Sequence, residues 1–239
     1  MSRQYDIIIV GAGAAGVFAA YELAKSHTRA SVLMLERGRP LEERVCPIKS
    51  GRVRSCIKCD PCHIMNGYGG AGALSDGKYN ITTKFGGDLH RYVGVEYAME
   101  LMEYVDSVLC AFGGAEAKLY STGTGDLKTK LLRHNLYLLD AKVRHLGTDR
   151  NVDILRRIYD ETKDRVDIRF GENVADIDRL PQGGFCVHTA GGESFTCQDL
   201  LLTGGRSGSR WIEIYELNRA TVKSSELIYV GQVLKLPAM

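Results

Sequence analysis

The hydrophobic pattern at the start of the chain predicts a strand, a glycine-rich turn, a helix and a second strand. Residues 7–10 are a continuous run of β-branched apolar residues, which is typical of a buried parallel strand. An apolar-rich stretch up to about residue 26 predicts the helix, and residues 31–35 predict the second strand. Together they form a β-turn-α-β unit of about 30 residues.

The middle of the chain combines an irregular segment with helical patterns. Residues 37–90 have little periodicity and are rich in Gly, Cys, Lys and Arg. Residues 90–112 place apolar side chains on one helical face, and further helices are predicted at about 126–138 and 151–162. A long irregular stretch inside a compact domain is usually functional, so we expect residues 37–90 to contribute to a site.

The last third of the chain predicts short strands separated by paired glycines. Five apolar or alternating runs have this pattern: 166–170, 173–177, 185–189, 193–197 and 200–203. From residue 211 to the end the pattern is weak and predicts no closing element. The order of elements therefore predicts an α/β fold with a Rossmann-like domain.

Composition narrows the class of protein further. The chain is 44% hydrophobic and 25% charged, which predicts a sizeable buried core. Its net charge of +2 gives no reason to expect nucleic acid or an acidic membrane as partner. The start has no long apolar h-region, and the chain has no run of 18 apolar residues, so we expect neither a signal peptide nor a membrane span. The expected location is the cytoplasm.

The turn after the first strand carries the sequence Gly-x-Gly-x-x-Gly. Gly11 permits the tight turn, Gly13 lets the backbone approach a pyrophosphate at the helix N-terminus, and Gly16 allows close packing of helix and strand. Glu36 ends the next strand about 20 residues further on, where a carboxylate accepts hydrogen bonds from ribose hydroxyls and repels the 2′-phosphate of NADP. The alternative is a tight turn beside a surface acid. The predicted contacts at this end of the cofactor are Gly11, Gly13, Ala14, Ala15, Gly16, Glu36 and Arg37.

Two further segments give this pattern a family resemblance. The opening YDIIIVGAGAAG, followed by VLMLERG, resembles two-dinucleotide-fold flavoproteins of the glutathione reductase type. The run LLTGGRSGS at 201–209 resembles the returning strand of that class, which implies that Thr203, Gly204 and Gly205 lie near the flavin diphosphate. Residues 173–177 resemble the segment that contacts adenine, with Val174 at the usual position.

The segment CDPCHIMNGYGGAGALSDGK at 59–78 is similar to a more specific group, the poorly characterised bacterial and archaeal FAD-dependent dehydrogenases. This resemblance implies FAD as cofactor, with Gly69 and Gly70 along the flavin, Ser75 donating a hydrogen bond and Lys78 near the ring. It covers about residues 1–210. Members of the group are longer, so the chain is expected to be an N-terminal portion.

Four cysteines, Cys46, Cys56, Cys59 and Cys62, form a cluster in the irregular segment. Their spacing leaves three possibilities open: ligands of an iron–sulfur cluster or zinc, redox-active thiols, or free thiols without metal. His145 is the candidate proton donor, and Lys78 is a second weak catalytic candidate. A histidine that is only packed or solvated is the simpler alternative.

We therefore expect an α/β protein with a Rossmann-like FAD/NAD(P)-binding domain and an inserted, partly present α-rich cap or substrate region. The predicted domains are 1–83 with 164–210 for FAD, 84–163 for the insertion, and 211–239 as an incomplete tail. The predicted function is an FAD-dependent oxidoreductase that moves a hydride between a small-molecule substrate and an electron partner such as NAD(P)H or a carrier protein. The alternatives are an NAD-binding oxidoreductase without flavin, and a truncated, inactive dinucleotide-binding module.

Overall fold

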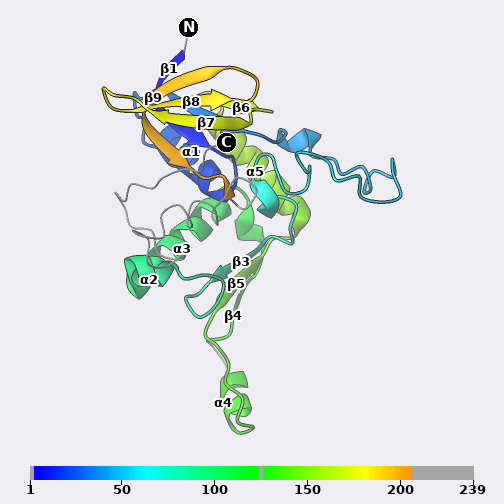
Figure 1. The fold of residues 1–239 in the computed structure, drawn as a ribbon. Helices are drawn as coiled ribbons and strands as arrows, with labels where there is room; N and C mark the ends of the chain where they lie inside the picture. Colours follow the sequence, from blue (N-terminus) through cyan, green and yellow to red (C-terminus); the bar gives the residue numbers. More distant parts are fainter. Residues whose placement is uncertain (1–2, 124–125, 206–239) are drawn as a thin grey trace, which may run out of the picture. The chain divides into compact units, whose positions relative to one another are not determined.

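The computed structural model describes residues 3–123 and 126–205, which form two compact units (Figure 1). The first unit contains the described residues up to Gly70 and those from Thr162 onward, and the second unit spans Ala71–Glu161. The chain thus divides after Gly70, whereas the sequence placed the division after residue 83. The predicted tail at 211–239 lies outside the described residues.

The first unit is built on a mixed six-stranded sheet in the order β6-β2-β1-β9-β8-β7. Its strands are β1 (Arg3–Val10), β2 (Val32–Glu36), β6 (Val166–Phe170), β7 (Val174–Arg179), β8 (Phe185–Thr189) and β9 (Ser194–Leu202). β6, β2, β1 and β9 pair in parallel, whereas β8 pairs antiparallel with both β7 and β9. The parallel half carries helix α1 (Ala14–Lys25), so the predicted β-turn-α-β unit is confirmed.

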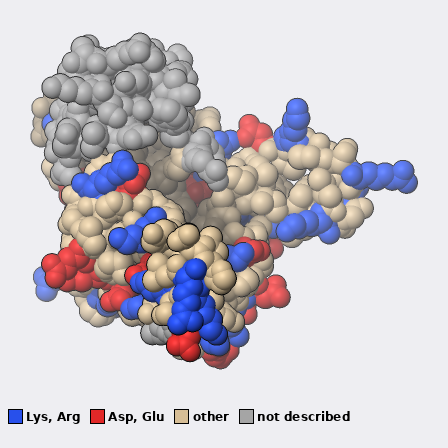
Figure 2. Space-filling model, turned by 90° about the horizontal axis from the view of Figure 1, so that it is seen from below, with Lys and Arg blue, Asp and Glu red and all other residues tan. Residues whose placement is uncertain are grey.

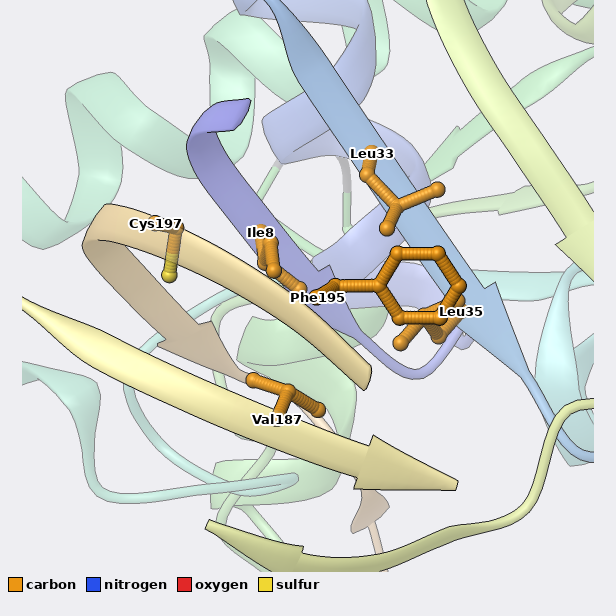
Figure 3. Packing of buried hydrophobic residues seen from close by; sticks show 6 residues of the cluster. All are labelled: Ile8, Leu33, Leu35, Val187, Phe195 and Cys197. Atoms are coloured by element: carbon orange, nitrogen blue, oxygen red, sulfur yellow. The ribbon is translucent and has the colours of Figure 1, made fainter. Parts of the chain in front are cut away.

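The burial of this sheet explains why its strands could be predicted from the hydrophobic pattern of the sequence. All five residues of β2 are buried, and the first four pair with the apolar residues Ile7–Val10 of β1. Their partners in β6 alternate between apolar residues and the charged Asp167 and Arg169. Figure 3 shows the ring of Phe195, from β9, extending toward Leu33 and Leu35 of β2, with Ile8 and Val187 in the same cluster. Burial of one such aromatic side chain stabilises the fold by about 1.5–3 kcal/mol.

The strands predicted at 193–197 and 200–203 are one continuous strand, β9, so this prediction was wrong. The first half of β9 lies between β1 and β8, but the pairing with β8 ends at Cys197, while the pairing with β1 continues to Leu202. Gln198 and Asp199 are exposed because they lie beyond the end of β8. These two polar residues therefore mark the point where β9 no longer pairs with β8, and not a break in the strand.

The second unit contains a three-stranded antiparallel sheet in the order β3-β5-β4 and four α-helices among the described residues. The elements are β3 (Lys78–Ile81), β4 (Leu119–Ser121), β5 (Lys142–His145), α2 (Leu89–Val93), α3 (Val95–Ala111), α4 (Leu127–Leu132) and α5 (Thr148–Thr162). A short 3-10 turn lies at Gly114–Glu116 in this unit; two others lie at Leu41–Glu43 in the first unit and at Gly70–Gly72, across the boundary between the units in the sequence. The sequence predicted none of these three strands, because they are short and their outer residues are exposed.

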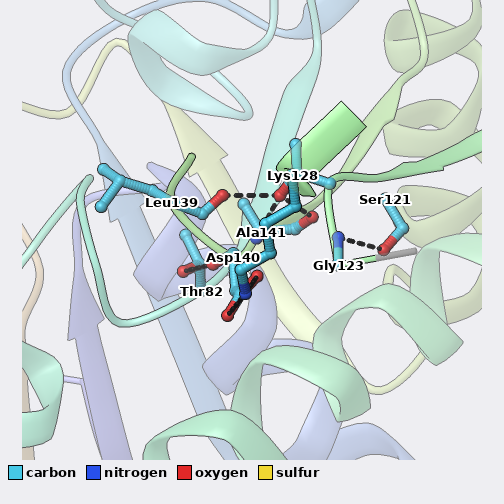
Figure 4. Close-up of polar contacts among 8 residues, drawn as sticks. Thr82, Ser121, Gly123, Lys128, Leu139, Asp140 and Ala141 are labelled. Carbon is cyan, nitrogen blue, oxygen red and sulfur yellow. Dashed lines mark hydrogen bonds and ion pairs between the residues drawn. The ribbon is translucent and has the colours of Figure 1, made fainter. Parts of the chain in front are cut away.

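Two predicted helices of the second unit differ from the structure. The helix predicted at 90–112 is divided at Gly94, whose φ of 85° cannot continue a helix. The helix predicted at 126–138 ends at Leu132, and it lies in the connection between β4 and β5. At the base of this connection, the Thr122 hydroxyl donates to the Leu139 carbonyl and accepts from the Ala141 N–H. The Thr82 hydroxyl donates to the Asp140 carbonyl beside them (Figure 4).

A buried ion pair holds α3 to β5 in this unit. The Arg144 guanidinium donates two hydrogen bonds to the Asp106 carboxylate, at 2.6 Å and 2.9 Å. It donates a third, at 2.6 Å, to the carbonyl oxygen of Ala117. Both charged side chains are nearly buried, with relative exposures of 9% and 13%, so removing either one would leave the other charge buried without its partner.

Within the described residues, no helix has the length and apolar character needed to span a membrane.

Candidate dinucleotide-binding site

The turn between β1 and α1 is shaped by three glycines with different surroundings. Gly11 has a φ of 101°, and its N–H donates to the Leu35 carbonyl at 2.7 Å. A Cβ on Gly16 would lie 2.0 Å from the Gly11 carbonyl oxygen, so helix and strand touch at this point. A Cβ on Gly13 would meet nothing nearer than 3.9 Å. The space beside Gly13 is therefore open, as the approach of a pyrophosphate requires.

Helix α1 begins at Ala14 with its backbone N–H groups exposed. Gly13 provides no side-chain cap, and the first turn contains no acidic residue. Ala14 and Ala15 are both exposed. An uncapped N-terminus carries partial positive charge and free N–H donors, which suit an anion.

Glu36 is buried and accepts three backbone hydrogen bonds. Its Oε1 accepts from the N–H groups of Gly38 and Gly67, at 2.7 Å and 2.9 Å. Its Oε2 accepts from the N–H of Ala12 at 2.7 Å. Because a carboxylate has about four acceptor positions, one position on Oε2 remains for a further donor. Glu36 therefore joins β1, β2 and the glycine-rich segment, and retains the capacity for one ribose hydroxyl.

The connection from β6 to β7 lies against the end of β2. The N–H of Gly171 donates to the Gly38 carbonyl, and the N–H of Glu172 donates to the Glu36 carbonyl, both at 3.0 Å. Val174 follows at the start of β7, half-buried against the core cluster. The connection thus brings Val174, two residues beyond Glu172, toward Glu36, which is far from it in sequence.

Thr203 directly follows the returning strand β9 and lies beside the turn. Its N–H donates to the Val10 carbonyl at 2.8 Å, and its hydroxyl lies within hydrogen-bonding distance of the carbonyls of Val10 and Gly11. A Cβ on Gly11 would lie 2.8 Å from the Thr203 carbonyl oxygen and 3.2 Å from the Gly204 Cα. Gly205, with a φ of 57°, is the last described residue. Residues 203–205 therefore border the same turn as Gly11.

The glycine-rich segment also reaches this turn. The N–H of Gly69 donates to the Ala12 carbonyl at 2.7 Å, and a Cβ on Gly70 would lie 3.0 Å from the Gly13 Cα. Gly70 has a φ of 60°, so its backbone conformation and its neighbours both favour glycine. The predicted cofactor contacts Gly69 and Gly70 are thereby placed next to the Gly13 opening.

Arg37 and Ser75 already have partners in the structure. The Arg37 guanidinium pairs with the Asp60 carboxylate, while its buried Nε has no hydrogen-bond partner among the described residues. In the second unit, the Ser75 hydroxyl donates to the Gly72 carbonyl at 2.7 Å. Their contacts with a cofactor remain predictions.

The structure places the two weak catalytic candidates opposite each other in the second unit. Lys78 on β3 and His145 on β5 are direct cross-strand partners. The Lys78 ammonium pairs with the Asp76 carboxylate at 2.9 Å, and this contact lowers the pKa of Asp76. All three residues are exposed, and a catalytic role for Lys78 or His145 remains a prediction.

The four clustered cysteines are free thiols, and the structure does not arrange them as metal ligands. Among the described residues, no group of three or more His, Cys, Asp or Glu side chains has the geometry to hold a metal ion. The geometry of this segment therefore gives no support to the predicted iron–sulfur or zinc centre.

Two buried polar side chains, Arg44 in the first unit and Asn151 in the second, each bind more than one backbone carbonyl. Neither of them was identified from the sequence. The buried Arg44 donates to the backbone carbonyls of His63, Ile64 and Tyr68 at 3.1, 2.6 and 2.6 Å. Burial lowers the pKa of its guanidinium. Asn151, also buried, donates to the carbonyls of Gly72 and Ala73. Every residue has a backbone carbonyl, so the local sequence does not indicate which carbonyls these side chains bind.

The fold and the turn together define a dinucleotide-binding Rossmann-like domain, and comparison with known proteins agrees. The family model described as "NAD(P)-binding Rossmann-like domain" matches residues 9–41. This match includes the three glycines and Glu36. No curated protein sequence matches the chain.

Two solved structures have a similar fold. Glycine oxidase from Geobacillus kaustophilus is 18% identical with a TM-score of 0.51, and the match covers 87% of this chain and 57% of that one. The 3-ketosteroid-delta4-(5alpha)-dehydrogenase from Rhodococcus jostii RHA1, solved with 4-androstene-3,17-dione, is 16% identical with a TM-score of 0.51. That match covers 92% of this chain and 49% of that one. The chain thus spans about half the length of these oxidoreductases, and the predicted α/β, Rossmann-like fold is confirmed.

Proposed function

We propose that this chain binds FAD at the β1–α1 turn and contributes the cofactor domain of an FAD-dependent oxidoreductase. The observation that carries the proposal is the open space beside Gly13, next to the uncapped N-terminus of α1. Glycines 69 and 70, Glu36 and Thr203 all border or support this one turn. The resemblance of residues 59–78 to FAD-dependent dehydrogenases favours FAD over other dinucleotides.

The residues around the turn fit such a cofactor. The N–H groups of Ala14 and Ala15 would bind the pyrophosphate, and the remaining acceptor position of Glu36 would bind one ribose hydroxyl. Val174 would contact adenine, and residues 203–205 would border the diphosphate. A bound flavin would supply hydride transfer between a small-molecule substrate and an electron partner such as NAD(P)H or a carrier protein. Ser75, Lys78 and His145 are the candidate contacts from the second unit.

The experiment is a titration of the full chain with FAD, NAD and NADP by calorimetry. We expect FAD to bind at least about tenfold more tightly than NAD, and NADP to bind weakest, because the Glu36 carboxylate repels a 2′-phosphate. Tighter binding of NAD would favour an NAD-dependent oxidoreductase without flavin, in line with the matching family model. Binding of none of the three would favour an inactive module.

A matched pair of glycine variants tests the location of the site. Gly13→Ala adds a methyl group to the open space, so FAD affinity should fall at least about tenfold while the melting temperature changes little. Gly123→Ala, in the β4–β5 connection of the second unit, adds the same methyl group 3.7 Å from the Ser121 hydroxyl. It should change neither value. Equal FAD affinity in both variants would place the cofactor elsewhere.

A further inference from the structure

The segment between Arg44 and Ile64 is a closed loop whose two ends are held together. We call residues 45–63 the cysteine loop. At its base, Arg44 donates to the carbonyls of His63 and Ile64, and the His63 Nδ1 lies 2.8 Å from the Val45 carbonyl oxygen. A loop closed in this way keeps residues from both of its ends near one another.

The loop encloses a cavity of about 60 Å³ that is lined by all four of its cysteines. Apolar side chains, including Val53 and Ile57, form part of the same lining. The four thiols are free, and Cys46, Cys59 and Cys62 are half-buried while Cys56 is exposed. The loop therefore gathers thiols around one small opening without arranging them as ligands of a metal ion.

The Cys46 thiol has the environment of a reactive cysteine. Hydrogen bonding from the backbone at Lys49 and Ile48 lowers the pKa of Cys46. The Lys49 charge lowers the pKa of Cys46 further. By contrast, burial raises the pKa of Cys110 and Cys186 outside the loop. A thiolate is the nucleophile in thiol chemistry, so Cys46 is the cysteine most suited to attack.

The loop surface is strongly positive. It carries Lys49, Arg52, Arg54 and Lys58, all exposed, whereas its acid Asp60 is paired with Arg37. Lys and Arg side chains gather on this loop, which forms the lobe on the right of Figure 2. Exposed charges of one sign raise the local concentration of anionic solutes, more so at low ionic strength.

We propose that the cysteine loop is a thiol–disulfide exchange site whose substrate is a low-molecular-weight disulfide carrying carboxylate groups. The Cys46 thiolate attacks one sulfur of the substrate, forms a mixed disulfide and releases the first thiolate, which takes a proton from water. A second cysteine of the cavity, as thiolate, attacks the Cys46 sulfur and displaces the second thiolate. Two protein thiols are oxidised to a disulfide, and the substrate disulfide is reduced to two thiols. The reaction does not require the proposed flavin.

The main test measures which disulfide reacts and where. The fully reduced chain is incubated with oxidised glutathione, which is anionic, or with cystamine, which is cationic, and is then alkylated and mapped by mass spectrometry. We expect a mixed disulfide at Cys46, followed by a disulfide between Cys46 and Cys56, Cys59 or Cys62. At low salt, oxidised glutathione should react at least about tenfold faster than cystamine, and added salt should narrow this ratio.

Two serine variants distinguish the reactivity of the cysteine loop from that of the thiols outside it. Cys46→Ser should slow the reaction at least about tenfold. The control Cys110→Ser removes another half-buried thiol and should leave the rate unchanged. With iodoacetamide at neutral pH, wild-type Cys46 should be alkylated at least about tenfold faster than Cys110.

Three outcomes would overturn the proposal. The first is modification spread evenly over all seven cysteines. The second is an equal rate with the anionic and the cationic disulfide at low salt. The third is stoichiometric zinc or iron on the purified chain with the loop thiols protected from alkylation. The comparison of the two disulfides uses the wild-type chain, so the proposal can fail even if a variant does not fold.

Discussion

The sheets of the two units differ in how much of their surface the chain itself covers. In the first unit, every residue of β2 is buried, and its neighbour β1 places the apolar residues Ile7–Val10 beside it. In the second unit, all three residues of β4 are exposed, and β3 has one buried residue. The first sheet is thus stabilised by continuous burial, whereas the second depends on local polar contacts such as the Arg144–Asp106 pair.

This difference predicts where the chain tolerates substitution. A closely packed backbone contact cannot adjust to added atoms, and a buried charge cannot lose its partner without cost. An exposed side chain, in contrast, contributes little to stability. The following four substitutions test this ranking by urea unfolding followed by circular dichroism.

The largest effect is expected for Gly16→Ala in the first unit. The new Cβ would lie 2.0 Å from the Gly11 carbonyl oxygen, so helix α1 must move away from β1. We expect a loss of at least about 4 kcal/mol in the free energy of unfolding, or no folded protein. Gly13→Ala, which has room for the same methyl group, should cost less than about 1 kcal/mol. Similar losses in the two variants would mean that the turn does not hold helix and strand in contact.

Arg144→Met should have the next largest effect. It leaves the Asp106 carboxylate nearly buried without its guanidinium, and the Ala117 carbonyl without a donor. We expect a loss of about 3 kcal/mol. The control Arg156→Met breaks an exposed pair with Asp153 on one helix and should cost about 0.5 kcal/mol or less. A loss at Arg144 no greater than at Arg156 would show that the second unit does not depend on this pair.

Glu36→Gln is expected to cost roughly 2 kcal/mol in the first unit. The amide keeps one acceptor oxygen, while its NH₂ group would face a backbone N–H that now donates to the carboxylate. The same variant removes the charge that disfavours NADP, so the preference for NAD over NADP should also decrease. An unchanged unfolding curve would mean that the three N–H groups find other acceptors.

Tyr137→Ser should have the smallest effect. Tyr137 lies between α4 and β5 and is 83% exposed. Removing its ring should change the free energy of unfolding by no more than about 0.5 kcal/mol. A loss above about 1 kcal/mol would show that this connection is covered in solution, and would remove the contrast between the two units.

The same contrast decided which elements could be predicted. β1, β2 and α1 followed from the apolar run at 7–10, the glycine spacing and the next apolar run, because β2 is buried throughout and β1 and α1 each have a buried apolar part. β3, β4 and β5 could not be predicted, since short exposed strands carry no alternation of apolar and polar residues. At the site, the turn glycines and Glu36 were predicted, but the three backbone hydrogen bonds that Glu36 accepts, from Ala12, Gly38 and Gly67, were not.

The sequence by itself determined the dinucleotide fold and its turn, because steric demands on glycine and the burial of parallel strands act over a few neighbouring residues. The tertiary structure alone decided which distant segments meet there. It brought Gly69 and Gly70 against Ala12 and Gly13, and the β6–β7 connection against the end of β2. It also closed the cysteine loop, through the hydrogen bonds that Arg44 donates to backbone carbonyls. Because every residue has a backbone carbonyl, no sequence pattern can predict which ones Arg44 binds.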